Sequence, residues 1–184
     1  MKQLTTTLAC FLFYSICFSQ TQSLSNDTMH WSESKKLAWT DFKGKEVKGA
    51  EKAQQSLMAM TASFTKGNPL KPTSTIVVTA FDRKKSWVSA SARTEQELRY
   101  YQVMFDIYEL HSRMLRKEFK GTKLGLDPNK IFQEKYSLAI ADLDEHVRTY
   151  NEETKSGADK AALDKWDEQI KKDLISLEDF RFTK

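Results

Sequence analysis

A long helical pattern in the middle of the chain constrains the fold more than any other feature. From Thr94 to Phe119, apolar residues recur at intervals of three and four, which places them on one arc of an α-helix. The arc holds Leu98, Tyr101, Met104, Phe105, Tyr108, His111, Leu115 and Phe119, and is widened by Val103, Ile107, Leu110 and Met114. A narrower polar stripe remains, made of Arg99, Gln102, Asp106, Glu109, Arg113, Lys117 and Lys120. We therefore expect a helix that other elements surround on most sides, with only the polar stripe left uncovered.

Two further helices are predicted after this one. Gly121 and Gly125 end the first helix, and Asp127-Pro128 starts the second, with Asp127 as N-cap and proline at the first helical position. Its apolar face contains Phe132, Tyr136, Ala139, Ile140, Leu143, Val147 and Tyr150. Ser156 resembles an N-terminal cap with an acidic partner three residues later, and it precedes a last helix. The apolar face of that helix contains Leu163, Trp166, Ile170, Leu174 and Leu177.

Strand-forming residues are concentrated before the helices. The segments 57–65 and 75–81 are rich in strand formers and are separated by glycine and prolines, which predicts an antiparallel pair joined by a long loop. A third short strand is expected at Leu37–Phe42, near two tryptophans, Trp31 and Trp39, that need burial. Strands followed by helices predict an α+β fold, a small antiparallel β-sheet followed by three long helices.

The N-terminal segment differs from the rest of the chain. Residues 1–20 contain one charge, Lys2, and an apolar run from Leu8 to Phe18, which is typical of a cleaved signal peptide and too short to span a bilayer. We expect an exported protein, periplasmic or secreted, with a single domain at residues 21–184. A lipoprotein anchored through Cys10 or Cys17 is the alternative. Both cysteines lie inside the predicted signal peptide, so the mature chain would contain neither disulfides nor thiolate-bound zinc.

Charge and motif content exclude several classes of function. The 29 basic and 25 acidic residues give a formal net charge of +4 and are interleaved along the chain, so no basic stripe predicts nucleic-acid binding. After the signal segment, no apolar run is long enough to span a membrane. A glycine-rich phosphate loop, a G-x-S-x-G motif and a mature cysteine nucleophile are all missing from the sequence.

Three segments of the chain carry a resemblance. They are Phe81-Asp82 with Ser86-Trp87-Val88, the window Tyr100-Tyr101-Gln102-Val103-Met104-Phe105-Asp106-Ile107-Tyr108-Glu109-Leu110, and Tyr150 to Trp166, with an earlier Trp39-Thr40-Asp41-Phe42. The sequence resembles the bacterial domain-of-unknown-function family 922, described as predicted secreted zinc-dependent proteases, whose central helix reads roughly H-E-Q-x-H-F-D-I-x-E-L. The resemblance implies a zincin-like, metalloprotease-like architecture.

The resemblance also implies a former metal site whose residues have changed. In an H-E-x-x-H helix two histidines bind zinc and the glutamate takes a proton from the metal-bound water. The matching positions here are Tyr100 and Met104 for the ligands and Tyr101 for the base, and Ser156 stands where a third ligand is expected. A phenol with a pKa of about 10 is a poor base at neutral pH, and a thioether is a poor zinc ligand. We therefore expect no catalytic residues, no metal and no cofactor.

Several residues admit two interpretations. Tyr100, Met104 and His111 lie close together on the helical wheel, so they line either a shared pocket or, more simply, a filled core. Glu109 is either a catalytic carboxylate or the partner of Arg113 in an i,i+4 ion pair. One acidic cluster either binds a cation or is solvated surface; it consists of Asp142, Asp144, Glu145 and His146. The basic run Arg83-Lys84-Lys85 likewise either binds an anionic ligand or is solvated surface.

These observations favour a non-catalytic relative of the protease family that binds a peptide or protein partner in the cell envelope through its former substrate cleft. The candidate cleft positions are Tyr100, Tyr101, Met104, His111 and Ser156. One alternative is a hydrolase with a rearranged site that uses His111, His146 or a carboxylate. Another is a purely structural envelope protein. The sequence does not indicate an oligomeric state.

Overall fold

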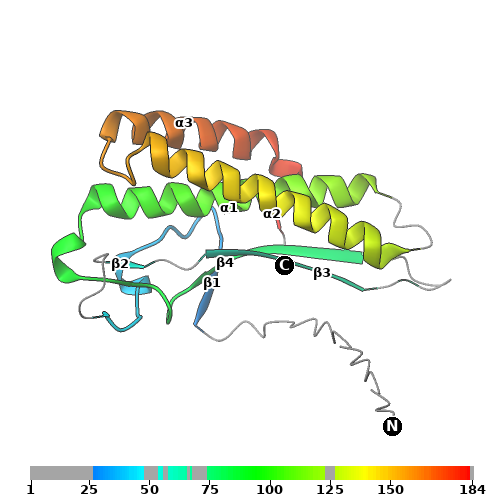
Figure 1. The fold of residues 1–184 in the computed structure, drawn as a ribbon, viewed down its shortest axis with the longest axis horizontal. Coiled ribbons are helices and arrows are strands. Elements are labelled where there is room, and N and C mark those ends of the chain that lie inside the picture. The colour runs from blue at the N-terminus through cyan, green and yellow to red at the C-terminus, as the bar shows by residue number, and fades with distance from the viewer. Residues whose placement is uncertain are drawn as a thin grey trace, which may run out of the picture.

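A computed structural model describes residues 27–47, 54–55, 58–65, 67, 74–122 and 127–182. An antiparallel sheet lies on one side of the molecule and three long helices cover one of its faces (Figure 1). This arrangement confirms the predicted α+β class. The predicted signal peptide, with Cys10 and Cys17, lies outside the described residues and stays a prediction.

The predicted pair of strands forms the centre of the sheet. β3 (Met58–Thr65) and β4 (Ser74–Asp82) are antiparallel, with Met58 opposite Phe81 and Thr65 opposite Ser74. β1 (Thr28–His30) pairs with the other edge of β4, so the strand order is β1-β4-β3. β2 (Gln54–Gln55) and β5 (Trp87–Val88) form a separate two-stranded pair.

The prediction of a short strand at Leu37–Phe42 is wrong. Residues Trp39–Asp41 form a 3-10 turn, in which the Asp41 carboxylate accepts a hydrogen bond of 3.0 Å from the backbone N–H of Ala38. Aspartate side chains compete in this way with regular strand pairing. The segment still supplies apolar residues to the core, because Phe42 is buried and its ring packs beside the aromatic residues of β4 and of the first helix.

The three predicted helices are confirmed, together with the N-cap predicted for the second. α1 (Glu95–Gly121) begins after Thr94, whose side chain accepts a hydrogen bond from the Glu97 N–H. α2 (Pro128–Glu153) begins after Asp127, which accepts from the Lys130 N–H as its sequence predicts. None of the helices in the described part of the chain has the length and apolar character that a membrane span requires.

The cap predicted for the third helix is wrong. α3 (Lys160–Ser176) begins after Asp159, which accepts a hydrogen bond from the Ala162 N–H. Ser156 lies instead in the turn between α2 and α3, where Lys155, Ser156 and Gly157 all have positive φ. The six-residue link between these two packed helices, 154–159, reverses the chain through this left-handed turn, and Asp159 is the residue left in position to cap α3.

Helix α1 is the centre of the molecule because the sheet lies on one side of it and α2 and α3 lie on the other (Figure 1). Its apolar arc is mostly buried, as expected, although Met114 is 47% exposed. The polar stripe is exposed only in part: Lys117 and Lys120 face solvent as expected, but Asp106, Glu109 and Arg113 are all at most 2% exposed. A C-terminal 3-10 turn, Glu178–Phe180, folds back against this stripe, so polar groups there are satisfied by one another rather than by water.

Candidate functional site

The positions matched to a zinc ligand and a general base lie inside the core. Tyr100 and Tyr101 are 6% and 5% exposed. The Tyr100 ring stacks on Tyr150 with centroids 5.2 Å apart, and its hydroxyl donates a hydrogen bond to Oδ1 of Asn151. The Tyr150 hydroxyl in turn donates to the backbone oxygen of Tyr100 at 2.9 Å. Of the two interpretations, the structure therefore supports the filled core at these positions.

The fold nevertheless brings Tyr100 and Ser156 together across 56 residues of sequence. Burial raises the pKa of Tyr100 to about 12; the charge of Glu97 adds to this shift, and a hydrogen bond with Ser156 opposes it. Burial also raises the pKa of Tyr101. Both phenols are therefore protonated at neutral pH and neither is a general base. Met104, one turn further along α1, is partly buried and packs against the same core.

The turn between α2 and α3 is fitted closely to this aromatic cluster. Gly157 has a φ of +89°, and a Cβ at this position would lie 2.8 Å from Cγ of Tyr100. The Gln96 side chain donates to the Gly157 carbonyl at 2.7 Å. Only glycine combines this backbone conformation with so close a neighbour, so the turn holds the tyrosine ring in place.

A buried charge network occupies the polar stripe of α1. Oε1 of Glu109 accepts hydrogen bonds from Nε of Arg113 at 3.1 Å and from Nη1 of Arg116 at 2.9 Å. Its other oxygen accepts from the Thr79 hydroxyl at 2.8 Å, and that hydroxyl lies 2.7 Å from Ser112 Oγ. The predicted Glu109–Arg113 ion pair is thus confirmed, but it is buried and forms part of a larger network. The sequence does not reveal this burial, because the covering residues come from β4 and the C-terminus.

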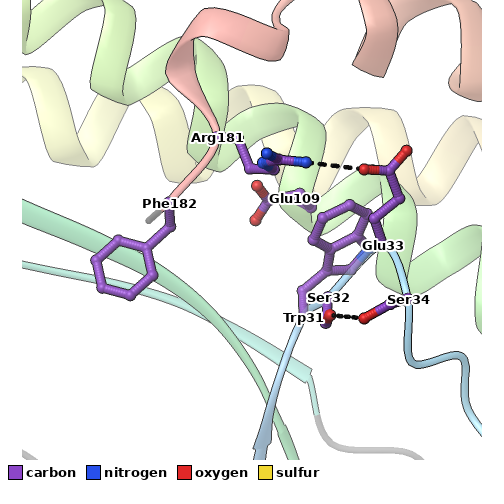
Figure 2. A pocket seen from close by; sticks show the side chains of 7 residues that line it. All are labelled: Trp31, Ser32, Glu33, Ser34, Glu109, Arg181 and Phe182. Carbon is purple, nitrogen blue, oxygen red and sulfur yellow. Dashed lines mark hydrogen bonds and ion pairs between the residues drawn. The ribbon is translucent and has the colours of Figure 1, made fainter. Parts of the chain in front are cut away.

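A pocket of about 530 Å³ opens beside this network, and we call it the Glu109 pocket. It is lined by Trp31, Ser32, Glu33, Ser34, Glu109, Arg181 and Phe182. The rings of Trp31 and Phe182 flank it, and the Arg181–Glu33 ion pair of 2.9 Å joins its two sides (Figure 2). Nε1 of Trp31 donates to Oδ1 of Asp106 at 2.6 Å, so the indole is held in one orientation. Sequence reasoning considered Trp31 only as a residue for burial and did not identify this pocket.

On the other side of α1, two residues that the sequence analysis treated separately form a pair. Nε2 of His111 lies 2.8 Å from Nδ1 of His146, and the His146 ring also contacts Trp166 on α3. Burial lowers the pKa of His111 to about 4; His146 adds to this shift and Asp142 opposes it. Burial also lowers the pKa of His146, against the charge of Asp173. Both imidazoles are therefore neutral at pH 7, and one donates a hydrogen bond to the other.

The remaining charged candidates are mostly at the surface. In the acidic cluster, Asp142, Asp144 and Glu145 are exposed, as expected, but the solvated position predicted for His146 is wrong because it is half-buried against His111 and Trp166. In the basic run 83–85, each residue forms an ion pair with a carboxylate: the partners of Arg83, Lys84 and Lys85 are Asp41, Asp27 and Asp82. Lys84 and Lys85 are 69% and 64% exposed, as the solvated interpretation predicts, whereas Arg83 is only 18% exposed.

Within residues 27–182, as far as the structure describes them, no three histidine, cysteine, aspartate or glutamate side chains are grouped as a metal site requires. No protein-family model, no curated protein and no solved structure matches this chain.

Proposed function

We propose that this protein is an exported, non-catalytic relative of zincin-like metalloproteases that acts by binding a peptide or protein partner. One observation carries this proposal. The fold places the turn that contains Ser156 against the Tyr100 ring, because a Cβ on the neighbouring Gly157 would lie 2.8 Å from Cγ of Tyr100. The resemblance assigns Tyr100 and Ser156 to metal ligands, yet neither residue type binds zinc readily. Tyr101 is buried and protonated at the position that the resemblance assigns to the base, which supports a site without protease chemistry.

Because Tyr100, Tyr101 and His111 are buried in the core, the partner needs another surface, and we assign it to the Glu109 pocket. Its two aromatic side chains, Trp31 and Phe182, are the residue types that anchor binding interfaces. Each acid that lines the pocket is neutralised, Glu33 by Arg181 and Glu109 by two arginines. A fixed indole and paired charges favour peptides of mixed composition and reduce the entropy lost on binding.

The proposal predicts that the mature protein cleaves no peptide. Purified protein incubated with a peptide library, with added zinc and with a chelator, should give the same products as buffer alone when they are analysed by mass spectrometry. The physical reason is that a protonated phenol cannot accept the proton of the attacking water. Zinc-dependent cleavage that the chelator abolishes would overturn the non-catalytic assignment.

The assignment to the Glu109 pocket is tested separately by binding. Peptides selected from a random library on the immobilised protein should lose about tenfold in affinity, which corresponds to about 1.4 kcal/mol, when Phe182→Ala is introduced. Phe182 is 37% exposed and lies at the pocket rim, so its removal should leave the melting temperature nearly unchanged. Ile175→Ala is the matched control, because this α3 residue is 73% exposed and is not among the residues that line the pocket. Equal loss in both variants would exclude the pocket.

A further inference from the structure

A second pocket, of about 650 Å³, lies between α2 and α3 and is here called the α2–α3 groove. Its apolar lining includes Trp166, Ile170 and Ala162 of α3, and His146 of α2 also lines it. Two α2 side chains restrict the orientation of the Trp166 indole. Its ring centroid lies 5.3 Å from that of Tyr150, in an edge-on contact, and 5.2 Å from that of His146. The groove therefore presents a fixed, half-buried aromatic side chain.

Two carboxylates of this groove are held by neutral donors. Oε2 of Glu153 accepts a hydrogen bond of 2.9 Å from Nε1 of Trp166, and Oδ1 of Asp173 accepts one of 2.9 Å from the Gln169 amide. In the part of the chain that the structure describes, neither carboxylate has a cationic partner within ion-pair distance. This distinguishes them from Asp164 and Asp167 on the same helix, which are paired with Arg99.

The charge of the groove is opposite to that of the whole chain. Three carboxylates line it, those of Glu153, Asp159 and Asp173, against one ammonium, that of Lys165, whereas the formal net charge of the chain is +4. Asp159 is already occupied, because it caps α3 and pairs with Lys155 at 3.4 Å. The free negative charge is thus at the two carboxylates held by neutral donors, one beside Trp166 and one further along α3.

We propose that the α2–α3 groove binds a cationic peptide segment, with one guanidinium or ammonium group over Trp166 beside Glu153 and a second at Asp173. An indole face next to a carboxylate attracts such a cation through both charge and the ring quadrupole. Seven helical residues separate Trp166 from Asp173, a rise of about 10 Å. Two basic residues three positions apart in a polyproline II conformation, which rises about 3.1 Å per residue with three residues per turn, match this spacing and point the same way.

This inference concerns a surface on the opposite side of α1 from the Glu109 pocket. Residues 109 and 111 project about 200° apart on the helix, because each residue advances about 100°. His111 contacts the groove residue His146, whereas Glu109 lines the other pocket. A failure of the groove to bind therefore leaves the proposed function untouched.

The probe is a fluorescent hexapeptide with two arginines separated by two prolines, titrated into the full mature protein at low salt with anisotropy as the readout. We expect saturable binding that weakens at least tenfold when both arginines are replaced by citrulline, their neutral isostere. The double variant Glu153→Gln/Asp173→Asn should weaken it by a similar factor. Glu168→Gln, which removes an exposed charge from the same helix outside the groove, should change the affinity less than twofold.

Several results would overturn the proposal. Equal affinity for the citrulline peptide would show that charge is not recognised, and an equal effect of Glu168→Gln would show general electrostatic attraction only. Trp166→Phe keeps an aromatic ring and removes the indole N–H that orients Glu153, so it should weaken binding about threefold; unchanged affinity would remove the indole from the site. Far-UV circular dichroism and melting curves confirm that each variant is folded, and a variant that fails this check is replaced by the corresponding single substitution.

Discussion

Glu109→Gln should lower the free energy of unfolding by about 3–5 kcal/mol, the loss expected when one partner of a buried ion pair is removed. The carboxylate is 2% exposed and accepts hydrogen bonds from both Arg113 and Arg116, and Arg113 is itself 1% exposed. Glutamine has nearly the same volume, so the loss comes from uncompensated positive charge rather than from a cavity. Urea unfolding at pH 7, followed by circular dichroism, measures the difference.

The control for this prediction is Glu178→Gln. Glu178 also accepts a hydrogen bond from Arg113, at 3.0 Å, but its side chain is 46% exposed. Water replaces an exposed partner, so this variant should lose less than about 1 kcal/mol. A loss of under 1 kcal/mol for Glu109→Gln as well would mean that the network does not hold the core together.

Acid should destabilise the protein through the His111–His146 pair. The pKa of His111 is lowered to about 4 in the folded protein, mainly by burial, whereas an unfolded histidine has a pKa of about 6.5. The unfolded state thus binds more protons between these two values, so stability is intact above pH 6.5 and falls as the pH decreases toward 4. A shift of this size corresponds to roughly 3 kcal/mol, and His146, whose pKa is also lowered, adds to it.

Because carboxylates also contribute to acid unfolding, the test is a difference between two profiles. The free energy of unfolding of His111→Phe and of the unmodified protein is measured from pH 7.5 to pH 4. The phenylalanine variant starts lower, because the imidazole of His146 loses its partner, but its slope between pH 6.5 and 4 should be clearly shallower. Asp142 and Asp173, which oppose the histidine shifts, remain in both proteins. Parallel profiles would refute the assignment of the acid response to this pair.

The sequence predicts best what is decided locally. The N-cap at Asp127 depends on side chains within a few residues, and the β3–β4 pair follows from strand formers around glycine and proline, so both are confirmed. The failures at Leu37–Phe42 and at Ser156 are also local in scale, but there a competing aspartate, Asp41 or Asp159, forms the decisive hydrogen bond. Where two side chains within a few residues of each other could each form the same hydrogen bond, the sequence pattern alone does not show which of them does.

The sites were harder to predict than the elements. The helical wheel placed Glu109 and Arg113 on a polar stripe, but their burial depends on residues of β4 and of the C-terminal turn, far away in sequence. The juxtaposition of His111 with His146 likewise depends on how α2 crosses α1, which no single-helix pattern contains. The filled core at Tyr100 and Tyr101 was the exception, because buried aromatic residues on a wide apolar arc are usual.

The covering of the α1 stripe by the C-terminus determines when folding can finish. Nη1 of Arg113 donates to the backbone oxygen of Leu174, and Nη1 of Arg116 donates to that of Phe180, contacts that span more than 60 residues. Closure of such long loops is slow, and the acceptors are synthesised after α1. A nascent chain that already contains the sheet and α1 has Glu109 for these two arginines but still lacks the backbone oxygens of Leu174 and Phe180. We therefore expect a ribosome-bound intermediate to leave this part of α1 uncovered until the turn at Glu178–Phe180 has emerged.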